Sequence, residues 1–355
     1  MNDGRLPFAD RFFASALGYF DVLSMYLGVR LELYSTLADK GPATAAQLAT
    51  RAHIAERYAR EWLEQQATRG ILLADVSSAE PTFSLPVDHA EALLDRDSLD
   101  YVGASVRQLA SLRGVVDLVA EAFQTGAGVP FEAYGSESVD GQGFTNRPIV
   151  LQTLPNEWLP AIPEVHERLS GGTPVRIVDV GCGTGWSSIG MAVTYPDASV
   201  DGFDPDETSV ERARRNAEEA GLGHRVRFHA EDAAGLGKHG PFYFATAFEC
   251  IHDMARPVDV LRSAREALAV DGAMLIVDER TRDAFTGEPD DLEAYYYAWS
   301  VFDCLPAGLS DRPSVGTGTV MRPATLRGYA EEAGFGGFEI LPIEHDTFRL
   351  YLLRP

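Results

Sequence analysis

The segment Asp179-Val180-Gly181-Cys182-Gly183-Thr184-Gly185 constrains the fold of this chain more than any other part of the sequence. It lies between an apolar run, Val175–Val180, and a second apolar stretch that begins at Trp186. Glycines let the main chain adopt positive φ and approach a ligand closely. The free N–H groups at the start of a following helix favour an anionic group such as a carboxylate. The pattern therefore predicts a strand, a ligand-binding turn and a helix, as in open α/β sheets.

Two common nucleotide-binding turns do not fit this segment. The dinucleotide fingerprint GxGxxG needs a third glycine where this chain has Trp186. A phosphate-binding P-loop needs a Lys-Ser or Lys-Thr pair, and none follows the glycines.

Strand and helix patterns alternate along residues 171–355. The expected strands are Val175–Val180, Ser199–Phe203, Val226–His229, Tyr243–Phe248 and Ala273–Val277, and the expected helices are Trp186–Tyr195, Glu207–Ala220 and Pro257–Leu268. This alternation predicts a parallel sheet with helices on both faces. Two last strands, Phe338–Leu341 and Phe348–Leu353, are joined by a short turn and must pair antiparallel. The expected fold class is α/β, a Rossmann-like sheet that ends in an antiparallel hairpin.

Two further regions precede this sheet. Residues 1–88 predict a winged helix: Thr44 is placed to cap a helix at Ala45–Arg51, a longer helix follows at Ala55–Arg69, and short strands are expected at 71–73 and 82–85. Residues 89–170 predict a helical region, with helices near Leu99–Phe123 and Pro148–Leu169 on either side of a Gly-rich loop, Gly126–Gly143.

The chain resembles the class I S-adenosylmethionine (SAM)-dependent methyltransferases. The glycine pattern Asp-x-Gly-x-Gly-x-Gly is typical of that superfamily. Other segments resemble a bacterial, largely actinobacterial subgroup with an amino-terminal winged helix, similar to small-molecule O-methyltransferases. They are Tyr58–Leu63, Gly141–Pro148, Asp179–Ser188, Phe248–Pro257, Asp278–Arg280 and Gly316–Pro323. The resemblance implies the class I methyltransferase fold and SAM as cofactor, with S-adenosylhomocysteine (SAH) as product.

The cofactor residues are expected at the carboxyl ends of the first three strands of the sheet. The candidates in the glycine turn are Asp179, Gly181, Cys182, Gly183 and Gly185. Asp204, followed by Pro205, ends the second strand, where a carboxylate can accept hydrogen bonds from both ribose hydroxyls. The resemblance implies that Asp232, followed by Ala233, contacts the adenine amino group, and Phe248 completes the set.

His252 is the first candidate for catalysis, because it follows the fourth strand at the edge of the crevice. In the similar O-methyltransferases a His-Asp-Trp motif occupies this place, and its histidine removes the proton of the acceptor hydroxyl. Here Met254 replaces the tryptophan. An imidazole titrates near neutrality and can act as a general base. Glu249 is an alternative base or a group that orients His252, and Asp253 either fixes the imidazole or begins the next helix. A metal site is not expected, because no other histidine lies between His252 and His345.

Aromatic residues are expected to shape the acceptor pocket. Tyr295, Trp299 and Phe302 lie on an apparent helix inserted after the fifth strand, and Tyr134, Phe144 and Asn146 come from the helical region. Aromatic walls favour an apolar or planar acceptor. Each of these residues could instead belong to the ordinary core.

Composition restricts the partners. The formal net charge of −23 disfavours nucleic acid and anionic membranes. No uninterrupted apolar run reaches the length of a membrane span, no secretory signal is recognisable, and the three cysteines form no CxxC pair. We therefore expect a cytoplasmic protein, no membrane partner and a small-molecule acceptor.

The winged helix can serve DNA binding or dimerisation. On its longer helix, Ile54, Tyr58, Trp62 and Leu63 form an apolar face, while three arginines are balanced by three glutamates on the other face. Apolar stripes at residues 12–20 and 22–27 suit interlocking helices, so we expect a homodimer through the amino-terminal helices. The alternatives to O-methylation are a C- or N-methyltransferase and a ligand-sensing transcription regulator with a methyltransferase-like body.

Overall fold

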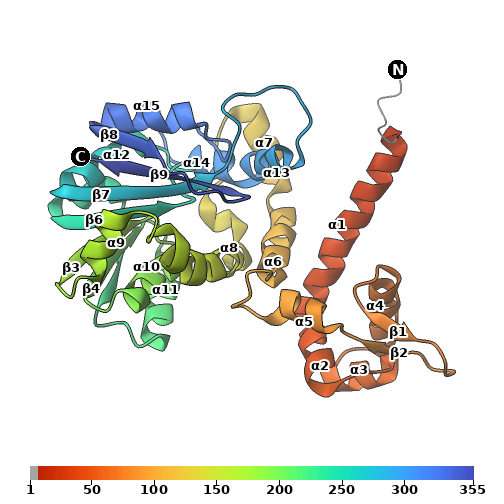
Figure 1. The fold of residues 1–355 in the computed structure, drawn as a ribbon. Helices are drawn as coiled ribbons and strands as arrows, with labels where there is room; N and C mark the ends of the chain where they lie inside the picture. Colours follow the sequence, from red (N-terminus) through yellow and green to blue (C-terminus); the bar gives the residue numbers. More distant parts are fainter. Residues whose placement is uncertain (1–6) are drawn as a thin grey trace. The chain divides into compact units, whose positions relative to one another are not determined.

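The computed structural model describes residues 7–355 and consists of two compact units that divide between Ser111 and Leu112 (Figure 1). The amino-terminal unit is mainly helical, and the carboxy-terminal unit contains the large sheet. The sequence-based boundaries at residues 88 and 170 mark changes of composition and stay predictions.

The first unit has the winged helix order. Its elements are α1 (Phe8–Arg30), α2 (Leu33–Lys40), α3 (Ala45–Ala52), α4 (Glu56–Thr68), β1 (Leu73–Asp75), β2 (Thr82–Ser84), α5 (Val87–Leu94) and α6 (Gly103–Ser111). Thr44 caps α3 as predicted, in a capping box with Gln47. The first strand begins two residues later than expected, because Ile71 and Leu72 pack in the core that holds Leu48 and Leu63.

The prediction of the apolar face of α4 is wrong at one residue, Tyr58. Trp62 and Leu63 are buried and Ile54 packs against the same core, but Tyr58 is 79% exposed. Tyr58 lies one helical turn before Trp62 and is not among the buried residues of α4.

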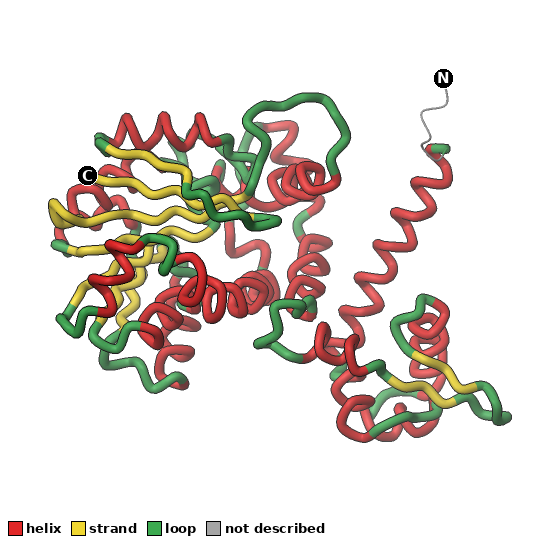
Figure 2. Tube along the Cα trace, viewed as in Figure 1, coloured by secondary structure: helices red, strands yellow, loops and turns green. Residues whose placement is uncertain are grey.

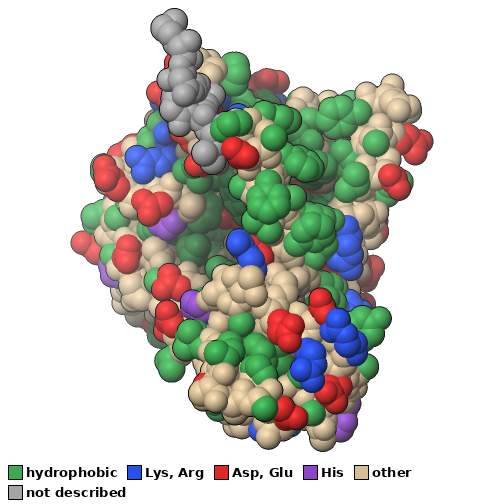
Figure 3. Space-filling model, turned by 90° about the vertical axis from the view of Figure 1, so that its right-hand side faces the viewer, with side chains coloured by type: hydrophobic (Ala, Val, Ile, Leu, Met, Phe, Trp, Pro, Cys, Tyr) green, Lys and Arg blue, Asp and Glu red, His purple; other side chains and the backbone are tan. Residues whose placement is uncertain are grey.

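Helix α1 carries an exposed apolar surface. Phe12, Phe13 and Phe20 are each at least 60% exposed, and hydrophobic side chains are also visible on the face shown in Figure 3. By length and composition alone α1 could cross a membrane, with a mean hydropathy of 1.4 and 11% of its window buried. A search for uninterrupted apolar runs does not find this helix, because Asp21 interrupts its apolar sequence. Asp21 is paired with Arg69 after α4, at 2.7 Å.

The second unit begins with a helical layer. It comprises η1 (Leu112–Gly114), α7 (Val116–Thr125), η2 (Phe131–Tyr134), α8 (Ser136–Pro148), η3 (Ile149–Trp158) and α9 (Pro163–Ser170). The predicted helix Leu99–Phe123 is interrupted at η1, and the predicted Gly-rich loop is partly helical. Gly141 and Gly143 lie inside α8, where small residues allow close packing.

A seven-stranded sheet forms the centre of this unit, in the order β5-β4-β3-β6-β7-β9-β8. Its strands are β3 (Val175–Val180), β4 (Ala198–Asp204), β5 (Val226–Ala230), β6 (Phe242–Phe248), β7 (Leu268–Glu279), β8 (Gly337–Ile340) and β9 (Phe348–Arg354). The first five are parallel, whereas β9 pairs antiparallel with both β7 and β8. This confirms the predicted fold class, including the antiparallel carboxy-terminal hairpin.

Helices cover both faces of the sheet (Figure 2). They include α10 (Trp186–Thr194), α11 (Glu207–Glu219), η4 (Ala233–Lys238), α12 (Pro257–Ala267) and α15 (Pro323–Ala333). The other helical segments after the glycine turn are α13 (Asp291–Trp299), η5 (Ser300–Cys304) and α14 (Leu305–Gly308). One core lies under η3, α9, α10 and α11, and the other lies under η4, α12 and α15. Because β3 to β7 run in parallel, their carboxyl ends meet along one edge, where ligands of such sheets bind.

Candidate active site

The carboxylate of Asp179 anchors the glycine turn from inside the protein. It accepts hydrogen bonds from the hydroxyls of Ser187 at 2.5 Å, Ser188 at 2.7 Å and Thr246 at 2.8 Å. Burial raises the pKa of Asp179, and these hydroxyls oppose that rise. Asp179 therefore ties β3, β6 and the start of α10 together beneath the turn.

The turn itself presents open backbone at Gly183. Gly183 has φ +49, and a Cβ built on it would meet no atom within 4 Å. Its N–H donates to Asp204 Oδ2 at 2.9 Å, while Oδ1 accepts from the N–H of Asp206. Burial raises the pKa of Asp204 to about 6, against these two backbone hydrogen bonds. Gly183 and Asp204 thus border one space at the ends of β3 and β4.

The other predicted cofactor residues lie along the same edge. Asp232 is exposed, caps η4 through the N–H of Ala234 and forms an ion pair with Arg256 at 3.2 Å. Ala233 and Cys182 are buried, and Pro205 is exposed. The structure brings this set to the ends of β3, β4 and β5, and their contact with a cofactor stays a prediction.

Glu249 follows β6 in a strained conformation. Its φ of 49° is positive, which is uncommon for a residue with a side chain. Its Oε2 accepts a hydrogen bond from Asn146 Nδ2 at 2.9 Å. Burial raises the pKa of Glu249 to about 7, while the Asn146 hydrogen bond and the charge of His252 act in the opposite direction. A carboxyl group with such a pKa can accept a proton near neutral pH.

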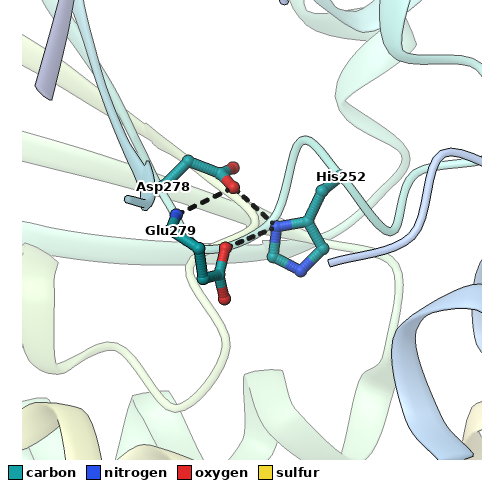
Figure 4. Close-up of side chains that lie close together, drawn as sticks. All are labelled: His252, Asp278 and Glu279. Carbon is teal, nitrogen blue, oxygen red and sulfur yellow. Dashed lines mark hydrogen bonds and ion pairs between the residues drawn. The ribbon is translucent and has the colours of Figure 1, made fainter. Parts of the chain in front are cut away.

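His252 is enclosed by carboxylates (Figure 4). Its side chain is 2% exposed, and Nδ1 lies 3.0 Å from Asp278 Oδ1 and 3.2 Å from Glu279 Oε2. Burial lowers the pKa of His252, but the charges of Glu279 and Asp278 outweigh it, so the pKa is raised well above its usual value. A raised pKa favours the charged form of the imidazole, which is not available to accept the proton of an acceptor hydroxyl. In the sequence, Asp278 and Glu279 stand out only as part of the resemblance, although two adjacent carboxylates at the end of the fifth strand could have indicated their role.

More acidic groups surround the same imidazole. Burial raises the pKa of Asp253 to about 7 and that of Asp303 to about 6, although the charge of His252 lowers both. The thiol of Cys304 also lies in the field of His252, and burial raises its pKa to about 11. The region around His252 is thus rich in acids.

Two family models match the chain. Residues 173–318 match a methyltransferase domain, and residues 21–96 match the Rv2258c-like winged HTH domain. The chain therefore carries a SAM-dependent methyltransferase domain. The methyltransferase match begins just before β3 and contains the glycine turn, Glu249 and His252.

Curated relatives resemble part of this methyltransferase. The 27-O-demethylrifamycin SV methyltransferase of Amycolatopsis mediterranei (strain S699) is 34% identical over 123 residues, which are 33% of this chain and 45% of that protein. A ribosomal RNA large subunit methyltransferase G from Pseudomonas entomophila (strain L48) is 34% identical over 30% of this chain and 29% of its own length. The chain thus spans less than half of the curated relatives it matches.

Solved structures share the fold over nearly the whole chain. The mitomycin 7-O-methyltransferase MmcR superposes with a TM-score of 0.71 at 18% identity, covering 98% of both chains. Human N-acetylserotonin methyltransferase in complex with SAM gives a TM-score of 0.69 at 16% identity, covering 100% of this chain and 99% of that one.

The open turn of this methyltransferase fits SAM. The space above Gly183 admits a ligand against bare backbone, and the neighbouring Asp204 carboxylate can accept ribose hydroxyl hydrogens. In contrast, a Cβ on Gly185 would lie 2.5 Å from the ring of Phe228, so this glycine serves packing.

The residues predicted for the acceptor pocket of the methyltransferase do not all lie together. Asn146 lines a small cleft at the end of β6 with Phe248, which was predicted as a cofactor residue, and with Glu249, Ile149, Val150, Trp158, Val277 and Phe348. Phe144 packs against Trp186 with ring centroids 6.0 Å apart. Tyr134 is 3% exposed and donates to the carbonyl of Phe302, so both belong to a local core. Tyr295 packs edge-on against Trp299 on α13, and neither lines the cleft.

Proposed function

We propose that this methyltransferase transfers the methyl group of SAM to a hydroxyl oxygen of a small aromatic or apolar molecule. The observation that carries this proposal is the position of Glu249 at the end of β6, where Asn146 bonds its carboxylate and apolar side chains line a small hollow beside it. Phe248 is partly buried and supplies aromatic surface beside Glu249, which favours a planar acceptor. Relatives named for small-molecule O-methylation, such as mitomycin 7-O-methyltransferase, support the same acceptor class.

Glu249 is the base that we propose, in place of His252. Glu249 lines the cleft and has a pKa of about 7, whereas His252 is buried, its Nδ1 is taken up by Asp278 and Glu279, and these carboxylates raise its pKa. Asn146 fixes the Glu249 carboxylate through its amide. As the new carbon–oxygen bond forms, Glu249 takes the hydroxyl proton, and the charge of His252 stabilises the carboxylate before the transfer.

The glycine turn and Asp204 are the residues that would hold the cofactor. When bound, SAM supplies a methyl group on a positively charged sulfur, whose carbon–sulfur bond breaks as the acceptor oxygen attacks. The turn and Asp204 position the cofactor, and positioning of this kind contributes much of the acceleration in a displacement reaction.

The charge balance of α4 supports a protein contact rather than DNA binding. Arg57 pairs with Glu61, Arg60 pairs with Glu56 at 3.1 Å, and Arg69 pairs with Asp21 at 2.7 Å. A recognition helix usually presents a net basic face. Red and blue side chains are intermingled on the face in Figure 3. We propose that the winged helix serves dimerisation.

A screen with SAM carrying a labelled methyl group tests the function. Purified protein is incubated with matched phenols, amines, carboxylic acids and keto acids, and mass spectrometry locates the labelled carbon. Label on oxygen supports the proposal, whereas label on carbon or nitrogen supports the alternative methyltransferases. Sequence-selective DNA binding at physiological salt, without any product, would instead support a regulator.

A further inference from the structure

A dense group of acids surrounds one imidazole at the ends of β6 and β7. Glu249, Asp253, Asp278, Glu279 and Asp303 all lie in the field of His252. Among the described residues, these five carboxylates form two ion pairs, and His252 is the cationic partner in both. So many buried carboxylates with one cationic partner are costly, because buried charges need a counterion or a metal ion.

Three of these side chains converge on one point (Figure 4). The distance from His252 Nδ1 is 3.0 Å to Asp278 Oδ1 and 3.2 Å to Glu279 Oε2. The three ligand atoms all lie within 4.8 Å of one another. Metal–ligand distances of about 2.0–2.2 Å are compatible with such spacings.

One buried oxygen in this group lacks a hydrogen bond. Asp278 is 1% exposed, and its Oδ2 has no hydrogen-bond partner among the described residues, whereas Glu279 Oε2 lies 3.2 Å from His252 Nδ1. Buried polar atoms usually find a partner, so an orphaned carboxylate oxygen indicates a ligand or ion. The oxygen without a hydrogen bond is evidence for a ligand that does not depend on how many acids surround His252.

We propose that His252, Asp278 and Glu279 bind a divalent cation of the first transition row. One imidazole nitrogen with two carboxylate oxygens is a mixed donor set, which suits Mn²⁺, Fe²⁺ or Zn²⁺ better than the all-oxygen preference of Mg²⁺ or Ca²⁺. Binding releases the proton on Nδ1 to bulk solvent, and the charge of the cation then replaces the charge of the imidazole beside Glu249.

The site borders the acceptor cleft. Val277 lines the cleft and directly precedes Asp278, and Glu249 lines it three residues before His252. A cation with three protein ligands keeps open positions, which an oxygen of the acceptor or a water can occupy. The cation proposal does not rest on methyl transfer, because ion binding can be measured without SAM or an acceptor.

Calorimetry on the full chain tests the proposal. The protein is treated with a chelator, dialysed and titrated with MnCl₂ and separately with ZnCl₂, and the Mn²⁺ titration is followed by electron paramagnetic resonance. We expect saturable binding of about one ion per chain. Glu279→Gln and Asp278→Asn are each expected to weaken binding by about 10-fold or more, since each removes one ligand. No saturable binding of either ion to the unmodified protein would overturn the proposal.

A matched variant controls for general loss of acidity. Asp201 also binds a histidine, with Oδ1 3.0 Å from His229 Nε2, but no third ligand atom from the described residues converges on that pair. Asp201→Asn should leave ion affinity within about twofold. SAH binding by each variant reports its folding, and if Asp278→Asn does not fold, Glu279→Gln decides. Equal losses in Glu279→Gln and Asp201→Asn, or unchanged affinity in Glu279→Gln, would contradict the site.

Discussion

The side-chain amide of Asn146 donates to Oε2 of Glu249 at 2.9 Å and joins helix α8 to the residue that follows strand β6. Glu249 is held there with a positive φ, a conformation that the surrounding structure must stabilise. The ionisation of Glu249 therefore depends on a contact with a helix distant in the sequence.

Replacing Asn146 with alanine should shift the pH dependence of methyl transfer. The hydrogen bond from Asn146 lowers the pKa of Glu249, so its loss raises that pKa above about 7. The rising limb of the rate profile should then move to higher pH. Asn156→Ala is the matched control, because that amide binds the carbonyl of Gln152 on the exposed side of η3. A uniform loss of rate with an unmoved limb would argue against Glu249 as the base.

Replacing Glu249 with glutamine should change how stability depends on pH. The pKa of Glu249 is raised from 4.5 to about 7 in the folded protein, so its stabilising contribution is complete below pH 4.5 and is lost as the pH rises through 7. Glu249→Gln should exceed the unmodified protein in unfolding free energy by about 1–3 kcal/mol at pH 8, with little difference near pH 4. Urea unfolding in the presence of a chelator measures this, and parallel pH profiles for the two proteins would contradict it.

The sequence allowed the sheet to be predicted strand by strand, because buried parallel strands are continuous apolar runs. Val175–Val180 was placed without error, and Asp204 and Glu249 were expected at strand ends, where the structure has them. The mechanism was less accessible. Asp278 and Glu279 enclose His252 only because β7 lies beside β6, and the burial that alters these pKa values is a property of the packed fold.

The packing of the helices before the sheet was the other feature that sequence patterns could not predict. Gly126–Gly143 read as a loop because glycine is a poor helix former. Its second half is helical since Gly143 packs tightly against the glycine turn, a tertiary contact that outweighs propensity. Tyr134 and Phe302 are aromatic residues of the kind that line acceptor pockets, but in the structure they pack in a local core.

Asp204→Asn should weaken binding of SAH and remove its pH dependence. The pKa of Asp204 is raised to about 6, so affinity of the unmodified protein should fall as the pH drops through 6 and the carboxylate gains a proton. The variant should bind about 1–3 kcal/mol more weakly at pH 7.5. Asp206→Asn is the control, because Asp206 caps α11 through the N–H of Ser209. Calorimetry at pH 5, 6 and 7.5 measures both, and equal affinities in all three proteins would remove Asp204 from the cofactor site.

The exposed face of α1 should hold two copies together. Phe13 and Phe20 are 65% and 60% exposed, and burying such rings contributes about 1.5–3 kcal/mol each. We expect the protein to be a dimer by light scattering, and Phe13→Glu with Phe20→Glu to give monomers that still bind SAH. Val270→Glu, at an exposed position outside α1, is the control, and this variant should remain dimeric. A monomeric unmodified protein would contradict this use of α1.

Gly143→Ala should disturb the cofactor site from helix α8, which packs against the glycine turn. A Cβ at Gly143 would lie 2.2 Å from Oγ1 of Thr184 and 3.2 Å from its Cβ, so α8 and the glycine turn must separate. Overpacking of this kind costs about 1–3 kcal/mol, and we expect a lower melting temperature and weaker SAH binding. Gly328→Ala in α15 is the control, because nothing lies within 4 Å of the added Cβ and alanine favours a helix. Adding Thr184→Ala removes the closest atom, so the double variant should recover most of the SAH affinity. If the double variant binds no better than Gly143→Ala, the contact between α8 and the turn does not control the site.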